Sequence, residues 1–342
     1  MVGQVTNSVP IFVGEAAHRI LKEAAFFGSG VVLNPSGFLR HRQPFVLGPF
    51  TITPFLNDHS AFDTYALLIE AGGRRLLYSA DLQAHGRKAG LFEEFIRNPP
   101  AGVDVLLIEG TNLRAEDTPK SGLTEQQVER DLIHTFRTAP GIVLAMYSGQ
   151  NIDRLVTMFR ACLRAERYFV LDLYAASVAG ATENPNIPKA GFNKVLVYVP
   201  LWQRVRVKES GEFGRASAIR PVRIYSEELA GRAKELVLTF RASMIREIEN
   251  AGCLAGAVAV WSMWPGYLEQ PGQERLLEFF RRKGIPLETH HASGHAHLPD
   301  LQRLAKAVAP ERLVPIHSFA PRRFAEFFEN VETHRDGEWW AV

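Results

Sequence analysis

Short apolar segments alternate with amphipathic segments along most of the chain, and this alternation limits the possible folds more than any other feature. Segments with the apolar character of buried strands are residues 45–52, 64–70, 74–79, 103–108, 142–146, 168–171, 195–199, 256–262, 285–290 and 312–316. Segments with apolar residues at helical spacing are 91–97, 124–138, 151–164, 227–249, 273–283, 298–308 and 321–329. Strands followed regularly by helices predict an α/β protein whose sheets are covered by helices.

Local signals refine this prediction. Gly72-Gly73 joins two strand patterns at hairpin spacing, which predicts an antiparallel hairpin over 64–79. Thr124-Glu125-Gln126-Gln127 has the form of a capping box, so a helix is expected to begin there. Residues 180–222 are rich in Pro, Asn, Gly and basic residues and indicate irregular surface structure.

The length of 342 residues is typical of about two domains. The 39 Lys and Arg residues nearly balance the 37 Asp and Glu residues, so charge neither supports nor excludes a polyanionic partner, which would need a local basic groove. Cys162 and Cys253 form no CxxC motif and are expected to be buried, reduced thiols. With neither a signal peptide nor a long apolar run, we expect a cytoplasmic protein without a membrane partner.

Three polar residues follow predicted strands or precede the hairpin, and each has two interpretations. His59 is either a turn residue or a functional histidine in the loop Asn57-Asp58-His59-Ser60. Asp81 is either a helix N-cap or a site carboxylate. Glu109 is either a solvated strand terminus or a second site carboxylate.

Histidines are concentrated near the C-terminal end of the sequence. Four of the eleven histidines lie in His290-His291-Ala292-Ser293-Gly294-His295-Ala296-His297, and His317 follows the apolar strand 312–316. Such a tract is either a chance cluster of histidines on the surface or a metal-binding segment. Histidines and carboxylates at strand ends are typical of a hydrolytic metal site.

These motifs, in this order, resemble the metallo-β-lactamase superfamily, and specifically its β-CASP branch of RNA-processing nucleases of the ribonuclease J and cleavage-factor endonuclease type. His59 in DHS, Asp81 in YSADLQAHGRK and Glu109 in LLIEGT resemble successive motifs of that family, although Ser79-Ala80 replaces its Thr-Gly. His295 in HASGHA and His317 in PIHS resemble the last two motifs.

The resemblance implies a fold and a set of roles. The fold would be a metallo-β-lactamase αββα sandwich, N-terminally incomplete, formed by residues 1–111 and 266–342, with an α/β β-CASP insert at 112–265. His59, Asp81 and His317 would be metal ligands, and His295, Asp81 and Glu109 catalytic residues. His291, Ser293 and Ser148 (the last in MYSGQNIDR) would hold substrate phosphate, while Arg154 and Arg160 would contact RNA or be ordinary surface charges.

The resemblance also implies two zinc ions, with manganese as an alternative, and single-stranded RNA as partner. A second copy of the chain, in a homo-oligomer, is the other partner considered. The family's HxHxDH motif does not occur in the 342 residues, and VPIFVGEAAHRILKEA resembles the strand and helix that follow it. A shortened reading frame or a degenerate homologue would explain this, and the expectation is weak or absent metal binding and little activity. The expected function is a phosphodiesterase or ribonuclease; the alternatives are a small-ester or lactone hydrolase and a non-catalytic RNA-binding homologue.

Overall fold

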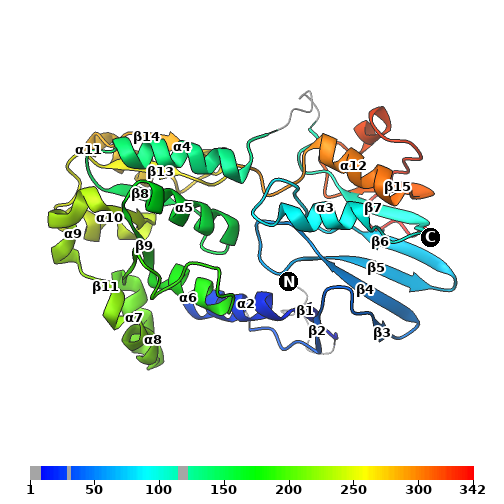
Figure 1. Ribbon diagram of the computed structural model, residues 1–342, viewed down its shortest axis with the longest axis horizontal. Coiled ribbons are helices and arrows are strands. Elements are labelled where there is room, and N and C mark those ends of the chain that lie inside the picture. The colour runs from blue at the N-terminus through cyan, green and yellow to red at the C-terminus, as the bar shows by residue number, and fades with distance from the viewer. Residues whose placement is uncertain (1–8, 29–31, 115–121) are drawn as a thin grey trace. The chain divides into compact units, whose positions relative to one another are not determined.

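The computed structural model describes residues 9–28, 32–114 and 122–342. The chain divides into two compact units, and Figure 1 shows their elements. Among the described residues, unit 1 contains 18–28, 32–33 and 125–292, and unit 2 contains 9–17, 34–114, 122–124 and 293–342. Both units are mixed α/β structures, as the alternation of segments predicts.

Unit 1 is built on a seven-stranded sheet in the order β11-β10-β9-β12-β8-β13-β14, and all the pairs are parallel. The strands are β8 (Val143–Met146), β9 (Tyr168–Asp172), β10 (Val195–Tyr198), β11 (Arg223–Ile224), β12 (Leu236–Thr239), β13 (Val258–Trp261) and β14 (Leu287–Thr289). Parallel strands buried on both faces need apolar residues throughout, which is why β8, β12 and β13 are almost continuously apolar.

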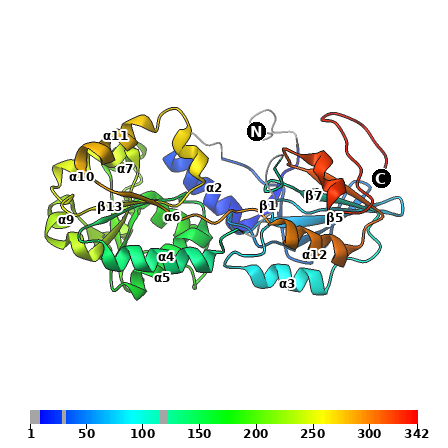
Figure 2. The ribbon, with the colours of Figure 1, turned by 90° about the horizontal axis from the view of Figure 1, so that it is seen from above.

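Helices cover both faces of this sheet, as Figure 2 shows from above. One core contains residues of α2 (Glu15–Phe27), α4 (Glu125–Thr138), α5 (Ile152–Arg164), α6 (Leu173–Ala181) and α7 (Leu201–Ser210). The core on the opposite face contains residues of α9 (Ser226–Arg232), α10 (Ile245–Asn250) and α11 (Glu274–Lys283). Strand residues alternate between the two cores, with Val143 and Ala145 in the first and Leu144 and Met146 in the second.

Unit 2 contains a six-stranded mixed sheet in the order β15-β7-β6-β5-β4-β3. The strands are β3 (Phe45–Leu47), β4 (Phe50–Leu56), β5 (Tyr65–Ala71), β6 (Arg74–Tyr78), β7 (Val105–Glu109) and β15 (Arg312–Ile316). Pairs from β3 to β6 are antiparallel, whereas β6, β7 and β15 run parallel. Helices α3 (Ala89–Arg97) and α12 (Leu298–Val308) bury Phe92, Phe95, Leu301 and Leu304 in its core. A short parallel pair, β1 (Phe12–Gly14) with β2 (Gly37–Leu39), also belongs to this unit.

The predicted hairpin is confirmed, because β5 and β6 pair antiparallel with Ala71 opposite Arg74. Gly72 and Gly73 have φ of 57° and 80°, which a type I′ turn requires and glycine adopts without steric cost. The predicted helix at 227–249 is wrong: it contains α9, strand β12 and α10 in succession. Leu236–Thr239 is fully buried and pairs with β8 and β9, so tertiary burial of three apolar residues and a threonine outweighs the helical periodicity.

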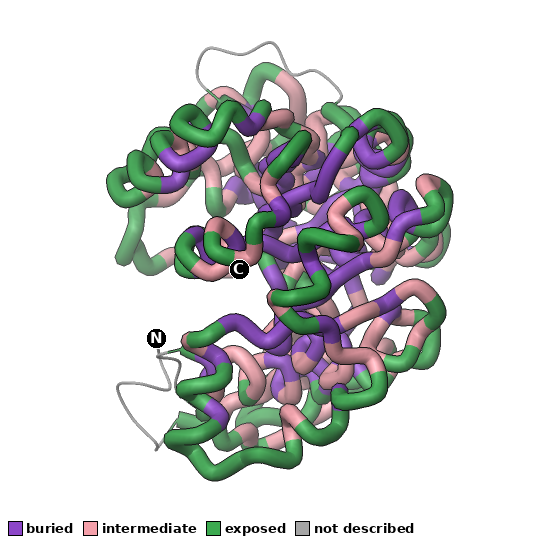
Figure 3. Tube along the Cα trace, turned by 90° about the vertical axis from the view of Figure 1, so that its left-hand side faces the viewer, coloured by how far each residue is buried: buried purple, intermediate pink, exposed green. Residues whose placement is uncertain are grey.

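Two other segments differ from expectation. Residues 321–329 form a 3₁₀ helix over Pro321–Glu326, and the segment expected to be irregular at 180–222 includes α7 and α8 (Gly214–Ala218). Figure 3 shows how the buried segments lie inside each unit and the exposed ones outside.

The unit boundaries also differ from the expected 111/112 and 265/266. The chain enters the long segment of unit 1 at Glu125 and leaves it after Ala292. The later exit has a direct cause, since β14 pairs with β13 and completes the sheet of unit 1. None of the helices in the described ranges is long and apolar enough to cross a membrane.

Candidate metal centre

Three neighbouring parallel strands of unit 2 end at the same edge of its sheet. Ile316 of β15 lies opposite Glu109 of β7, and Tyr78 of β6 lies opposite Leu107. Asp81, Glu109 and His317 therefore come from the carboxyl ends of adjacent strands, where loops of α/β sheets gather functional groups. His295, in the loop before α12, joins them.

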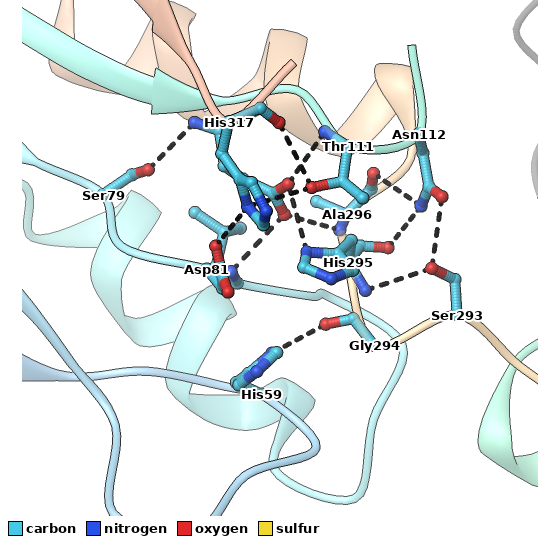
Figure 4. A network of polar contacts seen from close by, with 12 residues as sticks. His59, Ser79, Asp81, Thr111, Asn112, Ser293, Gly294, His295, Ala296 and His317 are labelled. Carbon is cyan, nitrogen blue, oxygen red and sulfur yellow. Dashed lines mark hydrogen bonds and ion pairs between the residues drawn. The ribbon is translucent and has the colours of Figure 1, made fainter. Parts of the chain in front are cut away.

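These four side chains place their ligand atoms within 4.8 Å of one another. Nδ1 of His317 lies 2.9 Å from Oδ1 of Asp81, and Nδ1 of His295 lies 3.3 Å from Oε2 of Glu109 (Figure 4). The side chains of Asp81 and His317 are 37% and 59% exposed, so solvent reaches one side of the cluster. Two carboxylates and two imidazoles form a donor set that suits zinc or manganese.

Glu109 is the buried anchor of the cluster, with 1% of its surface exposed. Its carboxylate accepts N–H groups of Thr111 at 3.2 Å, Ala296 at 3.1 Å and Leu82 at 3.4 Å. Burial lowers the pKa of His295, but the hydrogen bond and charge of Glu109 outweigh it, and the net pKa is raised. Glu109 is therefore not a solvated strand terminus.

His59 lies beside this cluster but outside the set of four. Its Nδ1 is 2.7 Å from the carbonyl oxygen of Gly294, and its ring centroid is 5.6 Å from that of His295. Burial lowers the pKa of His59, which keeps the imidazole neutral and able to bind a cation. Asp81 does not cap a helix, because the N-cap of the next helix, α3, is Lys88.

Three polar residues that the sequence did not single out fix the loops of the site. The buried carboxylate of Asp58 accepts the N–H groups of Gly86 at 3.0 Å and Lys88 at 3.2 Å, and thereby holds the loop after Asp81. Nδ2 of Asn57 donates to the carbonyl of Ser79 at 2.7 Å. Nδ2 of Asn112 donates to the carbonyl of His295 at 2.7 Å. In the sequence, these three residues are marked only by their positions near His59 and Glu109.

The residues expected to hold phosphate are divided between the units. Ser293 belongs to unit 2, where its hydroxyl donates to Oδ1 of Asn112 and accepts the N–H of His295, both at 3.2 Å. Ser148 and His291 belong to unit 1, and Ser148 is exposed in the loop after β8. Arg160 is half-exposed and pairs with Glu129 at 3.1 Å.

The expectation that Arg154 contacts RNA is wrong. Its side chain is fully buried, with Nη2 2.6 Å from Oε1 of Glu125 and Nη1 donating to the carbonyl of Ser262 at 2.7 Å. Arg154 thus ties helices α4 and α5 to the end of β13 and cannot present its charge to a ligand.

The titration of His291 is expected to make the free energy of unfolding depend on pH. Burial and the nearby charge of Arg154 lower the pKa of His291 to about 4. In the unfolded chain the imidazole of His291 takes up a proton below about pH 6.5, whereas in the folded protein it stays neutral. The contribution of the neutral imidazole to the free energy of unfolding is therefore complete above pH 6.5 and is lost as the pH falls toward 4. We expect this residue alone to lower the free energy of unfolding by about 2 kcal/mol between pH 7.5 and pH 5.

Urea unfolding of the wild type and of His291→Gln at both pH values measures this contribution, because the difference between the two proteins removes the effect of other titrating groups. Equal pH dependence in the two proteins would contradict the prediction.

The backbone is strained at two positions of the site. Ala80 and His317 have φ of 52° and 47°, in the left-handed region that costs a non-glycine residue about 1–2 kcal/mol. Glycine adopts this conformation freely, whereas Ala80 and His317 carry a Cβ atom. The side chains of His317 itself and of Asp81, which follows Ala80, face each other across 2.9 Å.

Gly110 allows the strand end of Glu109 to pack closely against the loop of His317. A Cβ atom at Gly110 would lie 2.5 Å from Cζ of Phe324 and 2.9 Å from Cβ of Ser318. We expect Gly110→Ala to lower the free energy of unfolding by about 1–3 kcal/mol through overpacking. Gly90→Ala in α3, where nothing lies within 4 Å, is the control and should be neutral or stabilising. Urea unfolding measures both, and equal stabilities would contradict the close packing described here.

Comparison with known proteins supports the α/β fold and indicates no activity. The sequence matches no protein-family model, and no curated protein matches it. Among solved structures, the chain is similar to a protein of unknown function from Enterococcus faecalis V583, with a TM-score of 0.75 and 19% identity, covering 97% of this chain and 75% of that one. At this identity the likeness supports the α/β fold alone.

Proposed function

We propose that this protein is a metal-dependent hydrolase of the metallo-β-lactamase fold that cleaves phosphodiester bonds in single-stranded RNA. The observation that carries the proposal is the convergence of Asp81, Glu109, His295 and His317 within 4.8 Å at the carboxyl edge of three parallel strands. The order of the motifs around these residues supports the β-CASP branch. The position of residues 125–292, which form a separate α/β unit between two parts of unit 2, supports it as well.

Some of these residues would hold the metal ion, and others position the groups around it. Asp81 and His317 are the most exposed members of the cluster and would hold a zinc or manganese ion, with His59 beside them. When bound, such an ion activates water and stabilises negative charge on a phosphoryl group. Glu109 fixes the imidazole of His295, which would donate a hydrogen bond to a phosphate oxygen of the substrate. Ser293, within hydrogen-bond distance of the His295 backbone N–H, shapes the same loop.

The test is a cleavage assay with the purified full chain. End-labelled single-stranded RNA and a chromogenic small ester are incubated separately with added zinc or manganese and with a chelator. The cluster offers Glu109 and His295 as donors beside Asp81 and His317, more than the ligands expected from the sequence. We therefore expect metal-dependent cleavage of the RNA, inhibited by the chelator, and no comparable hydrolysis of the ester. Ester hydrolysis without RNA cleavage would favour the small-substrate alternative, and RNA binding without cleavage would favour a non-catalytic homologue; either result overturns the proposal.

A further inference from the structure

Unit 1 contains a cavity that the proposed hydrolase site does not use. It has a volume of about 300 Å³, within the range of small-molecule sites, and is lined by residues that include Phe27, Gln150, Tyr174, Trp202 and Arg241. All five belong to unit 1. They come from α2, the loop after β8, α6, α7 and the segment after β12, and Figures 1 and 2 show α2 and α6 side by side.

The cavity lies where the topology of the parallel sheet predicts a ligand. Strands β9 and β12 are neighbours, but the chain leaves β9 toward β10 on one side and leaves β12 toward β13 on the other. The helix after β9 packs on one face of the sheet and the helix after β12 on the opposite face. Ligands of doubly wound sheets bind at such a reversal, outside the carboxyl ends of the strands. Tyr174 and Arg241 follow these two strand ends.

The lining favours a flat, uncharged heterocycle. Phe27 contacts the rings of Tyr174 and Trp202 edge to face, with centroids 5.6 and 6.1 Å apart. The guanidinium of Arg241 bonds through Nε and Nη2 to the buried carboxylate of Asp172, so its charge is balanced and an anion gains little there. Aromatic walls without a net charge stack well on nucleobases.

Polar groups are available for the edge of such a heterocycle. The phenol of Tyr174 lines the cavity and accepts a hydrogen bond from Gln150, so its hydroxyl is fixed beside the cavity. Gln150 is exposed, donates through Nε2 to the hydroxyl of Tyr174 at 3.0 Å, and carries an amide able to pair with a base. Gly149 beside it has no room for a Cβ, which would lie 2.8 Å from Cε1 of Tyr174.

From this geometry we infer that unit 1 binds a nucleobase in the cavity formed by Phe27, Tyr174, Trp202, Gln150 and Arg241. The base stacks on the aromatic side chains, and its edge bonds to the exposed amide of Gln150. The inference does not depend on the proposed hydrolase activity, because every residue that carries it lies outside the metal cluster.

The experiment titrates the full chain with adenosine, guanosine, cytidine and uridine, using ligand-observed NMR and calorimetry, with ribose and inorganic phosphate as control ligands. At least one nucleoside should bind, and neither control ligand should. Trp202→Leu is expected to weaken binding by about 5- to 150-fold, the range of one base–aromatic contact. Gln150→Ala, at an exposed position that does not endanger folding, should weaken it by about two- to tenfold.

Two matched variants complete the design. Trp264→Leu alters another tryptophan of unit 1 that does not line the cavity and should bind as the wild type does. Asp81→Asn should also bind nucleosides normally, so a failure of the hydrolase proposal leaves this result intact. Absence of nucleoside binding, or binding unchanged in both Trp202→Leu and Gln150→Ala, would overturn the inference.

Discussion

Replacing Arg154 with leucine is expected to lower the free energy of unfolding by about 3–5 kcal/mol, because it removes a fully buried cation that pairs with the buried carboxylate of Glu125. The guanidinium donates to both oxygens of Glu125 and to the backbone and hydroxyl of Ser262. Thr157 donates a further hydrogen bond to Glu125 at 2.5 Å. One substitution therefore leaves several buried polar atoms with fewer partners.

Urea unfolding measures this effect, and two variants serve as controls. Arg160→Leu removes a half-exposed arginine from the same helix and should cost at most about 1 kcal/mol. The double variant Glu125→Leu/Arg154→Leu removes both charges and should recover part of the loss, since an apolar pair leaves no buried charge uncompensated. A cost below about 1 kcal/mol for Arg154→Leu would show that this network does not hold unit 1 together.

The second large effect concerns metal binding. Asp81→Asn is expected to weaken the binding of zinc or manganese by more than about 100-fold, because a neutral amide replaces the more exposed carboxylate of the cluster, and even outer-shell partners of metal sites contribute 10- to 100-fold. Calorimetric titration with each metal measures the affinity, and the RNA cleavage assay should lose its metal-dependent rate in the same variant.

Asp300→Asn is the matched control, since Asp300 lies on α12 of the same unit and pairs with Arg303 at 3.4 Å. It should bind metal as the wild type does. If Asp81→Asn and the wild type bound metal equally, the ion would have to be held elsewhere, and the cluster would not be a metal centre.

Much of the fold was predictable from local signals. The strand–helix alternation located β5 to β10 and β13 to β15, and Gly72-Gly73 fixed the hairpin, because burial and turn geometry act over a few residues. The single strand expected at 45–52 is instead β3 and the start of β4. Strand β12 was missed because its four residues lie among short helices, and only pairing with β8 and β9 makes them a strand. The unit boundary at Ala292 was missed for the same reason, since it depends on the pairing of β14 with β13.

The candidate site was predictable in part. Asp81, Glu109, His295 and His317 were singled out at strand ends, and the structure brings them together. The role of Asp58 was not predictable, because its bonds go to backbone N–H groups about 30 residues away. Arg154 was misinterpreted because an arginine in a helix is usually a surface charge, and its buried partner Glu125 lies on another helix.

The division of unit 2 between early and late parts of the chain has a consequence for synthesis on the ribosome. A nascent chain that has grown to Ala292 already carries all seven strands of unit 1, but only Asp81 and Glu109 of the metal cluster. The sheet of unit 1 can therefore form before β15 pairs with β7 in the sheet of unit 2. The metal centre is completed only when His317 emerges, so the full cluster assembles after all seven strands of the unit 1 sheet have been made.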